Sequence, residues 1–207
     1  MATQMDIVNE ALTELGQPPS VSINDKNRRT IAIKQVYDSV LENLLSQHNW
    51  GFATKTLTLA LIESEFETEF DYAYSLPVDF FRLIEGVPTG YPFRILGGEL
   101  HVNYNGFKLV YVAKTTNVNE MTPEFRSLFS VALQAKAAYA ITGSQATQAK
   151  RQEDYREKLR IAIANDSRNS TFPKCAFENT WINARYARTA STPWVKLDPS
   201  VDYGDIL

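Results

Sequence analysis

His48-Asn-Trp-Gly-Phe-Ala-Thr-Lys55 is the stretch at which the pattern of this 207-residue chain changes. Before it, apolar residues recur every three or four positions, as they do on one face of a helix. After it, helical periodicity is absent for about seventy residues and returns at Thr122. Trp50 and Phe52 are large apolar residues on either side of Gly51, whose missing side chain lets the backbone turn. We therefore expect Trp50 and Phe52 to anchor a junction between helical and β-rich parts of the chain.

The composition is that of an ordinary globular protein, with 44% hydrophobic and 22% charged residues. The formal net charge of −3 argues against tight, sequence-specific binding of nucleic acid, which requires a basic surface. Cys175 is the only cysteine, so an intramolecular disulfide and a cysteine-rich metal site are excluded. We expect neither a secretory signal nor a membrane span, because no basic segment leads into an apolar run of sufficient length.

Four segments have the periodicity and the end signals of helices. The third has the clearest start: Thr122 is a good N-cap residue, Pro123 suits the first helical position, and Glu124 suits the first turn. The predicted helices run from Met5 to Leu15, from Asp25 or Arg28 to His48, from Thr122 to Gly143, and from Ser144 to about Asp166.

The region between the second and third helices has the pattern of short strands. Leu57, Leu59 and Leu61 alternate with threonine and alanine, as in a half-buried strand. Gly97-Gly98 and Asn105-Gly106 are signals for tight hairpin turns. Strands joined by such turns indicate a small antiparallel β domain.

Together these signals predict an α+β fold. It consists of a four-helix bundle, a small antiparallel β domain inserted between the second and third helices, and an extended C-terminal tail. The predicted boundaries are 1–51 for the first two helices, 52–121 for the β domain, 122–166 for the last two helices and 167–207 for the tail.

An acidic residue occupies every second position between the first predicted strands. The five residues are Glu63, Glu65, Glu67, Glu69 and Asp71. In an extended chain they would share one side, with Phe66 and Phe70 on the other. The regular spacing and the absence of a glycine turn do not fit an EF-hand calcium loop. A solvated acidic loop or strand edge is the favoured interpretation.

Residues 167–207 combine Ser, Thr, Asn and Pro with scattered aromatic residues, which disordered tails usually lack. Such a segment suits docking on another surface, where Trp, Tyr and Arg are common anchors. The alternative is that the tail wraps around its own chain. The candidate interface residues are Trp181, Arg185, Tyr186, Arg188 and Trp194.

No motif of an enzyme is present. The chain has no Gly-x-Ser-x-Gly, His-Glu-x-x-His, phosphate-binding loop or dinucleotide fingerprint. His48 and His101 are the only histidines, and Cys175 has no histidine near it in sequence. We therefore predict no catalytic residue, no cofactor and no metal site, and expect that the protein is not an enzyme.

Three stretches carry a resemblance to a known family. They are Ala11-Leu-Thr-Glu-Leu-Gly-Gln-Pro-Pro19, Trp50-Gly-Phe-Ala-Thr-Lys55 and Tyr72-Ala-Tyr-Ser-Leu-Pro-Val-Asp-Phe-Phe-Arg82. In this order, and with helices before and after a β region, they resemble the tail tubular protein A family of short-tailed bacteriophages, which form the adaptor between portal and tail nozzle. The resemblance covers residues 5–165, and no quoted motif lies beyond residue 166.

The resemblance implies a structural virion protein at the head–tail junction, made in the host cytoplasm. It implies a ring of about twelve identical copies. The partners would be the portal protein and the nozzle protein, with tail fibres as an additional contact and double-stranded DNA passing through without specific binding. The portal would contact the aromatic tail, and Glu63, Glu65, Glu67, Glu69 and Asp71 would face the channel or the nozzle. No catalytic residue is carried over from the family.

Two other functions stay open from the residues alone. One is an envelope-degrading hydrolase of the phage tail that uses carboxylates of the acidic run. The other is a DNA-binding module, which would show a strong dependence of affinity on salt.

Overall fold

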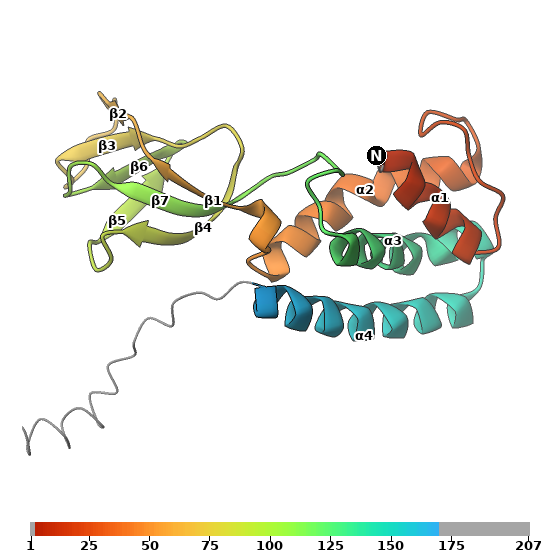
Figure 1. Ribbon diagram of the computed structural model, residues 1–207. Helices are drawn as coiled ribbons and strands as arrows, with labels where there is room; N and C mark the ends of the chain where they lie inside the picture. Colours follow the sequence, from red (N-terminus) through yellow and green to blue (C-terminus); the bar gives the residue numbers. More distant parts are fainter. Residues whose placement is uncertain (1–2, 170–207) are drawn as a thin grey trace, which may run out of the picture. The chain divides into compact units, whose positions relative to one another are not determined.

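The structure is a computed structural model that describes residues 3–169 (Figure 1). Within these residues, two helices precede a strand-rich region and two follow it. The helices are α1 (Gln4–Glu14), α2 (Arg28–Gln47), α3 (Pro123–Thr142) and α4 (Gln145–Asn169). A short 3-10 turn (Gly51–Ala53) leads into the strands, which are β1 (Thr54–Thr58), β2 (Leu61–Ile62), β3 (Tyr72–Ser75), β4 (Phe80–Val87), β5 (Phe93–Leu96), β6 (Glu99–Val102) and β7 (Lys108–Ala113).

Local signals determine where α1 and α3 begin. Before α1, Thr3 and Asp6 form a capping box in which each side chain accepts a hydrogen bond from the other's backbone N–H. Before α3, the Thr122 hydroxyl accepts a hydrogen bond from a first-turn N–H, and Pro123 needs no acceptor. Gly143 ends α3 with a φ of 70°, which a residue with a Cβ rarely adopts. The sequence signals at the ends of α3 are confirmed.

Helix α3 is the centre of the helical part, because it packs against each of the other three helices (Figure 1). Its small residues Ala132, Ala135 and Ala138 let neighbouring helices come close on several sides. Helix α4 differs: Ala162 is its only fully buried residue. The helical part therefore consists of α3 surrounded by three helices that are buried to different extents.

The predicted four-helix bundle with an inserted β domain is wrong. The described strands form two antiparallel sheets, one with the order β1-β7-β4 and one with the order β2-β3-β6-β5. The core of the helices continues into the first sheet, where it includes Val112 and receives Phe81 and Ile84 from β4. The physical reason is that β7 is buried on both faces: Val112 faces the helical core, and its neighbours Tyr111 and Ala113 belong to a second core.

This second core takes side chains from both sheets. Its members include Tyr74 and Leu100, which are paired across β3 and β6, and Leu109 on β7. The hydroxyl of Tyr74 donates to the Tyr104 carbonyl at 2.8 Å and accepts from the Gly106 N–H at 2.9 Å. The hairpin predicted at residues 105–106 is wrong, because the turn there connects β6 of the second sheet to β7 of the first and these two strands do not pair. The bonds of Tyr74 attach this turn to the second sheet.

Helix α4 continues to Asn169, three residues past its predicted end. Most of the predicted tail, residues 170–207, lies outside the described residues. The domain boundaries at residues 51, 121 and 166 stay predictions. In the described part of the chain, no helix is long and apolar enough to cross a membrane.

Asp79 connects three strands of the first sheet by polar contacts. Its carboxylate accepts hydrogen bonds from the Lys55 ammonium at 2.7 Å and from the Tyr111 hydroxyl at 2.9 Å. The Lys55 bond is the main cause that holds the pKa of Asp79 below its usual value. Burial and the neighbouring Asp79 carboxylate raise the pKa of Tyr111 to about 12.

We expect Asp79→Asn to lower the free energy of unfolding at neutral pH, by about 1 kcal/mol or less because the Asp79 side chain is 34% exposed. The pKa of Asp79 is lower in the folded state than in the unfolded state, where it is about 4. The ionised carboxylate therefore stabilises the fold fully above about pH 4, and this stabilisation is lost as the pH falls through the folded-state pKa. Urea unfolding of the natural chain and of Asp79→Asn, from pH 7 to pH 2.5, measures the difference in their free energies of unfolding. A difference that stays constant over this range would contradict the assignment.

Candidate functional site

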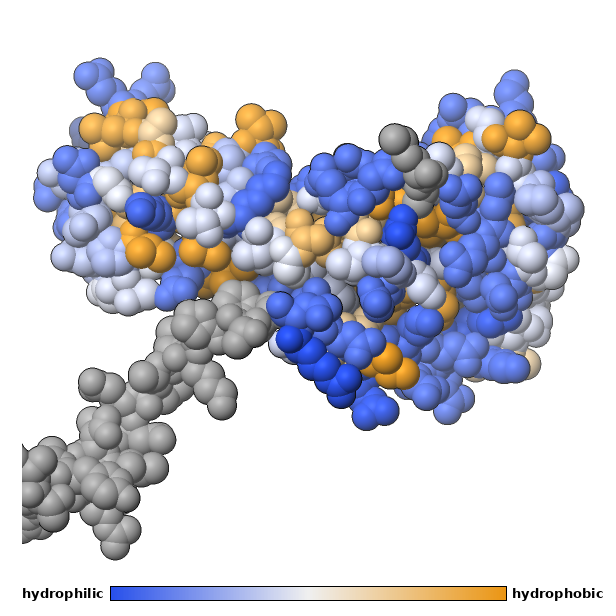
Figure 2. Space-filling view, viewed as in Figure 1, coloured by the Kyte–Doolittle hydropathy of each residue, from blue (hydrophilic) through white to orange (hydrophobic). Residues whose placement is uncertain are grey.

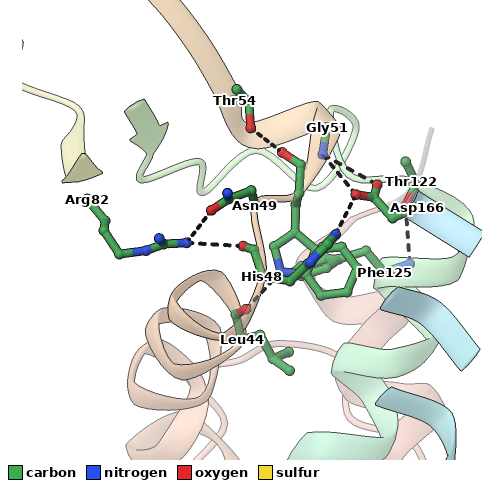
Figure 3. Close-up of polar contacts among 10 residues, drawn as sticks. Leu44, His48, Asn49, Gly51, Thr54, Arg82, Thr122, Phe125 and Asp166 are labelled. Carbon is green, nitrogen blue, oxygen red and sulfur yellow. Dashed lines mark hydrogen bonds and ion pairs between the residues drawn. The ribbon is translucent and has the colours of Figure 1, made fainter. Parts of the chain in front are cut away.

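The indole of Trp50 is the centre of the junction between α2 and β1, and its partners Leu44, His48 and Phe125 are labelled in Figure 3. Trp50 is 1% exposed, and its ring makes edge-on contacts with His48 and Phe125, with centroids 5.0 Å away in both cases. Its Nε1 donates to the Leu44 carbonyl at 2.8 Å. This carbonyl lies in the last turn of α2, where backbone acceptors lack a partner within the helix. Trp50 therefore ends α2 and packs against α3 at the same time.

Phe52 lies beside it and is partly buried against the same core. Its ring packs on Phe125 with the centroids 4.8 Å apart. The structure thus brings the two predicted anchor residues together on one aromatic ring of α3.

A carboxylate from the far end of the described chain completes the junction. Asp166, in the last turn of α4, accepts hydrogen bonds from His48 Nε2 at 3.0 Å and from the Gly51 N–H at 3.2 Å (Figure 3). An acidic residue at this end of a helix opposes the helix dipole, so its local environment alone would not favour it. The contacts with His48 and Gly51 explain its position: they hold the end of α4 against the end of α2.

Arg82 of β4 reaches the same place. Its Nη2 donates to Asn49 Oδ1 at 2.7 Å and lies 3.5 Å from the His48 carbonyl (Figure 3). Sequence reasoning assigned no role to Arg82 or Asp166. Arg82 could have been singled out, because it is the last residue of the motif at residues 72–82. Asp166 could not, because it lies 118 residues from His48 and no sequence pattern relates the two.

The junction offers no evident chemistry. A histidine beside a carboxylate can act as a general base, but it needs a reactant or nucleophile within hydrogen-bond distance. Among residues 3–169, no hydroxyl or thiol forms a hydrogen bond with the His48 ring. The same residues contain no group of three or more His, Cys, Asp or Glu side chains placed to hold a metal ion. Packing and hydrogen bonding are the roles that the contacts support.

We expect Asp166→Ala to lower the free energy of unfolding by about 2 kcal/mol, because it leaves His48 and the Gly51 N–H without their acceptor. Glu157→Ala is the control, since Glu157 is an exposed residue of the same helix and should change stability by less than about 0.5 kcal/mol. Urea unfolding followed by circular dichroism measures both. Equal effects of the two substitutions would show that the Asp166 contacts are not stabilising.

The acidic run forms a loop between β2 and β3, not a strand. Its five acidic residues are all exposed: Glu63, Glu65, Glu67, Glu69 and Asp71. The loop covers the outer face of the second sheet, where the Ser64 hydroxyl donates to Glu99 Oε2 at 2.6 Å and Thr68 Oγ1 lies 3.4 Å from His101 Nδ1. The ring of Phe66 lies edge-on to His101, although Phe66 is 45% exposed. The run is therefore a solvated loop that is attached to the sheet by the contacts of Ser64 and Thr68 and by one ion pair, which joins Glu69 to Arg94 of β5 at 3.5 Å.

The predicted interface residues of the tail lie outside the described residues. They are Trp181, Arg185, Tyr186, Arg188 and Trp194. Their role stays a prediction from the sequence.

Comparison with known proteins gives no further assignment: no protein-family model matches this chain, and no curated protein sequence matches it significantly.

Proposed function

We propose that this chain is a structural subunit of the head-to-tail adaptor of a short-tailed bacteriophage, related to the tail tubular protein A family. The observation that carries the proposal is that two motifs of the resemblance meet at one packed junction. Lys55 of the motif of residues 50–55 donates to Asp79 of the motif of residues 72–82 at 2.7 Å, and Arg82 of the second motif donates to Asn49, the residue before the first.

The other motifs also serve packing. Ala11 and Leu12 of the motif at residues 11–19 are fully buried in the helical core. Glu14 of the same motif accepts a hydrogen bond from Arg151 of α4 through its carbonyl oxygen, at 2.6 Å. This use of the first motif supports the same proposal, because all three quoted stretches stabilise the fold and none presents a reactive group.

In this proposal about twelve copies form a ring under the portal. The portal protein and the tail nozzle protein contact the ring on opposite sides, tail fibres add a further contact, and DNA passes through the channel. The net charge of −3 supports a conduit, because a surface without excess positive charge does not hold DNA by releasing counterions. The site of action is the virion tail, after synthesis in the host cytoplasm.

Apolar side chains on the surface support a role in assembly (Figure 2). Repeated weak contacts become collectively strong in a closed ring. On the helices the exposed large apolar residues are Ile31, Tyr139 and Ile161. In the strand-rich region they include Leu57, Leu61, Val87, Tyr91, Phe93 and Ile95.

Sedimentation velocity of the full chain with the portal protein encoded by the same genome tests the proposal. The expected result is a single fast complex that contains both proteins in a fixed ratio and resists raised salt. The portal protein alone and this chain alone are the controls. Two independent boundaries at all ratios would refute the adaptor function. Binding to DNA that weakens steeply with salt would instead favour a DNA-binding module.

A further inference from the structure

The acidic loop borders an open pocket on the outer face of the second sheet. The pocket has a volume of about 490 Å³. The sheet contributes Ile62, Ala73 and His101, and the loop contributes the rest of the lining, namely Glu63, Ser64, Phe66, Glu67, Thr68, Phe70 and Asp71. The pocket thus combines apolar and aromatic walls with three exposed carboxylates.

We propose that this pocket binds a basic side chain, arginine or lysine, of a protein partner. Carboxylates and aromatic rings are the two groups that recognise a guanidinium or an ammonium ion, the first by charge-assisted hydrogen bonds and the second by cation–π contact. Glu63, Glu67 and Asp71 supply the charge, and Phe66 and Phe70 supply the rings.

The charges of the pocket have no cation within the described residues. The only ion pair recorded there for the acidic run joins Glu69 to Arg94 at 3.5 Å, and Glu69 does not line the pocket. Glu63, Glu67 and Asp71 line the same pocket, and none of them has an ion-pair partner within residues 3–169. A bound cation supplies the opposite charge that these carboxylates lack.

His101 gives a second, independent indication of a ligand. It lines the pocket, its side chain is 1% exposed, and its Nε2 has no hydrogen-bond partner. Glu99 Oε2 lies 3.5 Å from this nitrogen and already accepts a hydrogen bond from Ser64. A buried polar atom without a partner costs free energy. With the ring proton on Nδ1, which then donates to Thr68 Oγ1, Nε2 is an acceptor, and an N–H donor of a bound arginine or lysine placed beside Nε2 and Glu99 supplies its partner.

A metal ion fits the pocket less well than an organic cation. Within residues 3–169 no three His, Cys, Asp or Glu side chains converge closely enough to hold a metal ion. The aromatic walls also offer nothing to a metal, whereas they suit the flat face of a guanidinium.

This inference rests on the proposed function only for the identity of the partner, which would be the protein that follows the adaptor in the tail. The pocket itself is complete within one chain. Binding of a basic peptide can therefore be measured without a ring or a portal. Failure of peptide binding would leave the adaptor function standing, and failure of ring assembly would leave the pocket standing.

The test uses the full chain and an acetylated, amidated decapeptide that contains two arginines among glycine and serine residues. The control peptide has citrulline at both arginine positions, which keeps the shape and removes the charge. Isothermal titration at low salt should show at least about tenfold tighter binding of the arginine peptide. Nitrogen-15 NMR of the same titration should move the His101 Nε2 resonance.

Two double variants provide a matched control within the loop. Glu63→Gln with Glu67→Gln removes two charges from the pocket, whereas Glu65→Gln with Glu69→Gln removes two charges from the same loop outside it. The first pair should weaken binding of the arginine peptide about tenfold or more, and the second less than about threefold. Equal losses in both variants, equal affinity for the two peptides, or a His101 resonance that does not move would each overturn the proposal.

Discussion

Trp50→Ala is expected to lower the free energy of unfolding by about 3–5 kcal/mol, the range for removing a large buried aromatic side chain. Trp50 is 1% exposed and lies in the core that the helices share with the first sheet. Alanine leaves a cavity between His48 and Phe125, and it leaves the Leu44 carbonyl without its donor. Loss of packing and loss of a helix-end hydrogen bond therefore add to each other.

Trp50→Phe is the milder variant. Phenylalanine retains part of the ring packing but removes the hydrogen bond to Leu44 and the five-membered ring of the indole, so we expect a loss of about 2 kcal/mol, smaller than that of Trp50→Ala. Guanidinium unfolding followed by circular dichroism measures both variants. A loss below about 1 kcal/mol for Trp50→Ala would contradict the assignment of the junction to the core.

Deletion of residues 170–207 is expected to abolish docking on the portal while the remaining chain stays folded. The described residues contain both cores and every helix cap discussed above, so the free energy of unfolding should change little. The truncation point matters. A cut after residue 166 removes the last three residues of α4 and frays the turn that holds Asp166, so the chain should end at Asn169.

Co-sedimentation with the portal protein measures docking, and a thermal melt of each chain measures folding. The full-length quintuple variant with alanine at Trp181, Arg185, Tyr186, Arg188 and Trp194 is the companion, since it retains the length of the tail. It should dock as poorly as the truncated chain if these side chains are the anchors. Normal docking of the chain that ends at residue 169 would refute the role of the tail.

Some elements could be predicted because their signals are local. The start of α3 depends on Thr122 and Pro123, which act within one turn, and its end depends on the single Gly143. Tight turns at Gly98 and Gly106 also follow from the conformational freedom of glycine, and both residues have positive φ.

The fold class could not be predicted in the same way, because it depends on how elements share a core. Residues 109–113 of β7 are all apolar, which is compatible with burial on both faces, but this pattern does not indicate that one face, with Val112, lies in the helical core. The alanines of α3 predict close packing without indicating on how many sides. Four amphipathic helices were therefore interpreted as a bundle, although α3 is in fact surrounded by the other three.

The candidate site shows the same division. Trp50 and Phe52 stand out in the sequence by size and by the glycine between them. Asp166 and Arg82 do not, because their importance comes from contacts made across 118 and 33 positions of the chain. The pocket under the acidic loop depends on His101 from a distant strand, so the sequence indicated only an acidic loop.

Electron microscopy of the full chain mixed with the portal protein of the same phage tests the adaptor function most directly. The expected result is a closed ring of this chain capping the portal, with a central channel wide enough for double-stranded DNA and with density for the tail against the portal. Particles of the portal alone, beside free single copies of this chain at all mixing ratios, would refute the adaptor function.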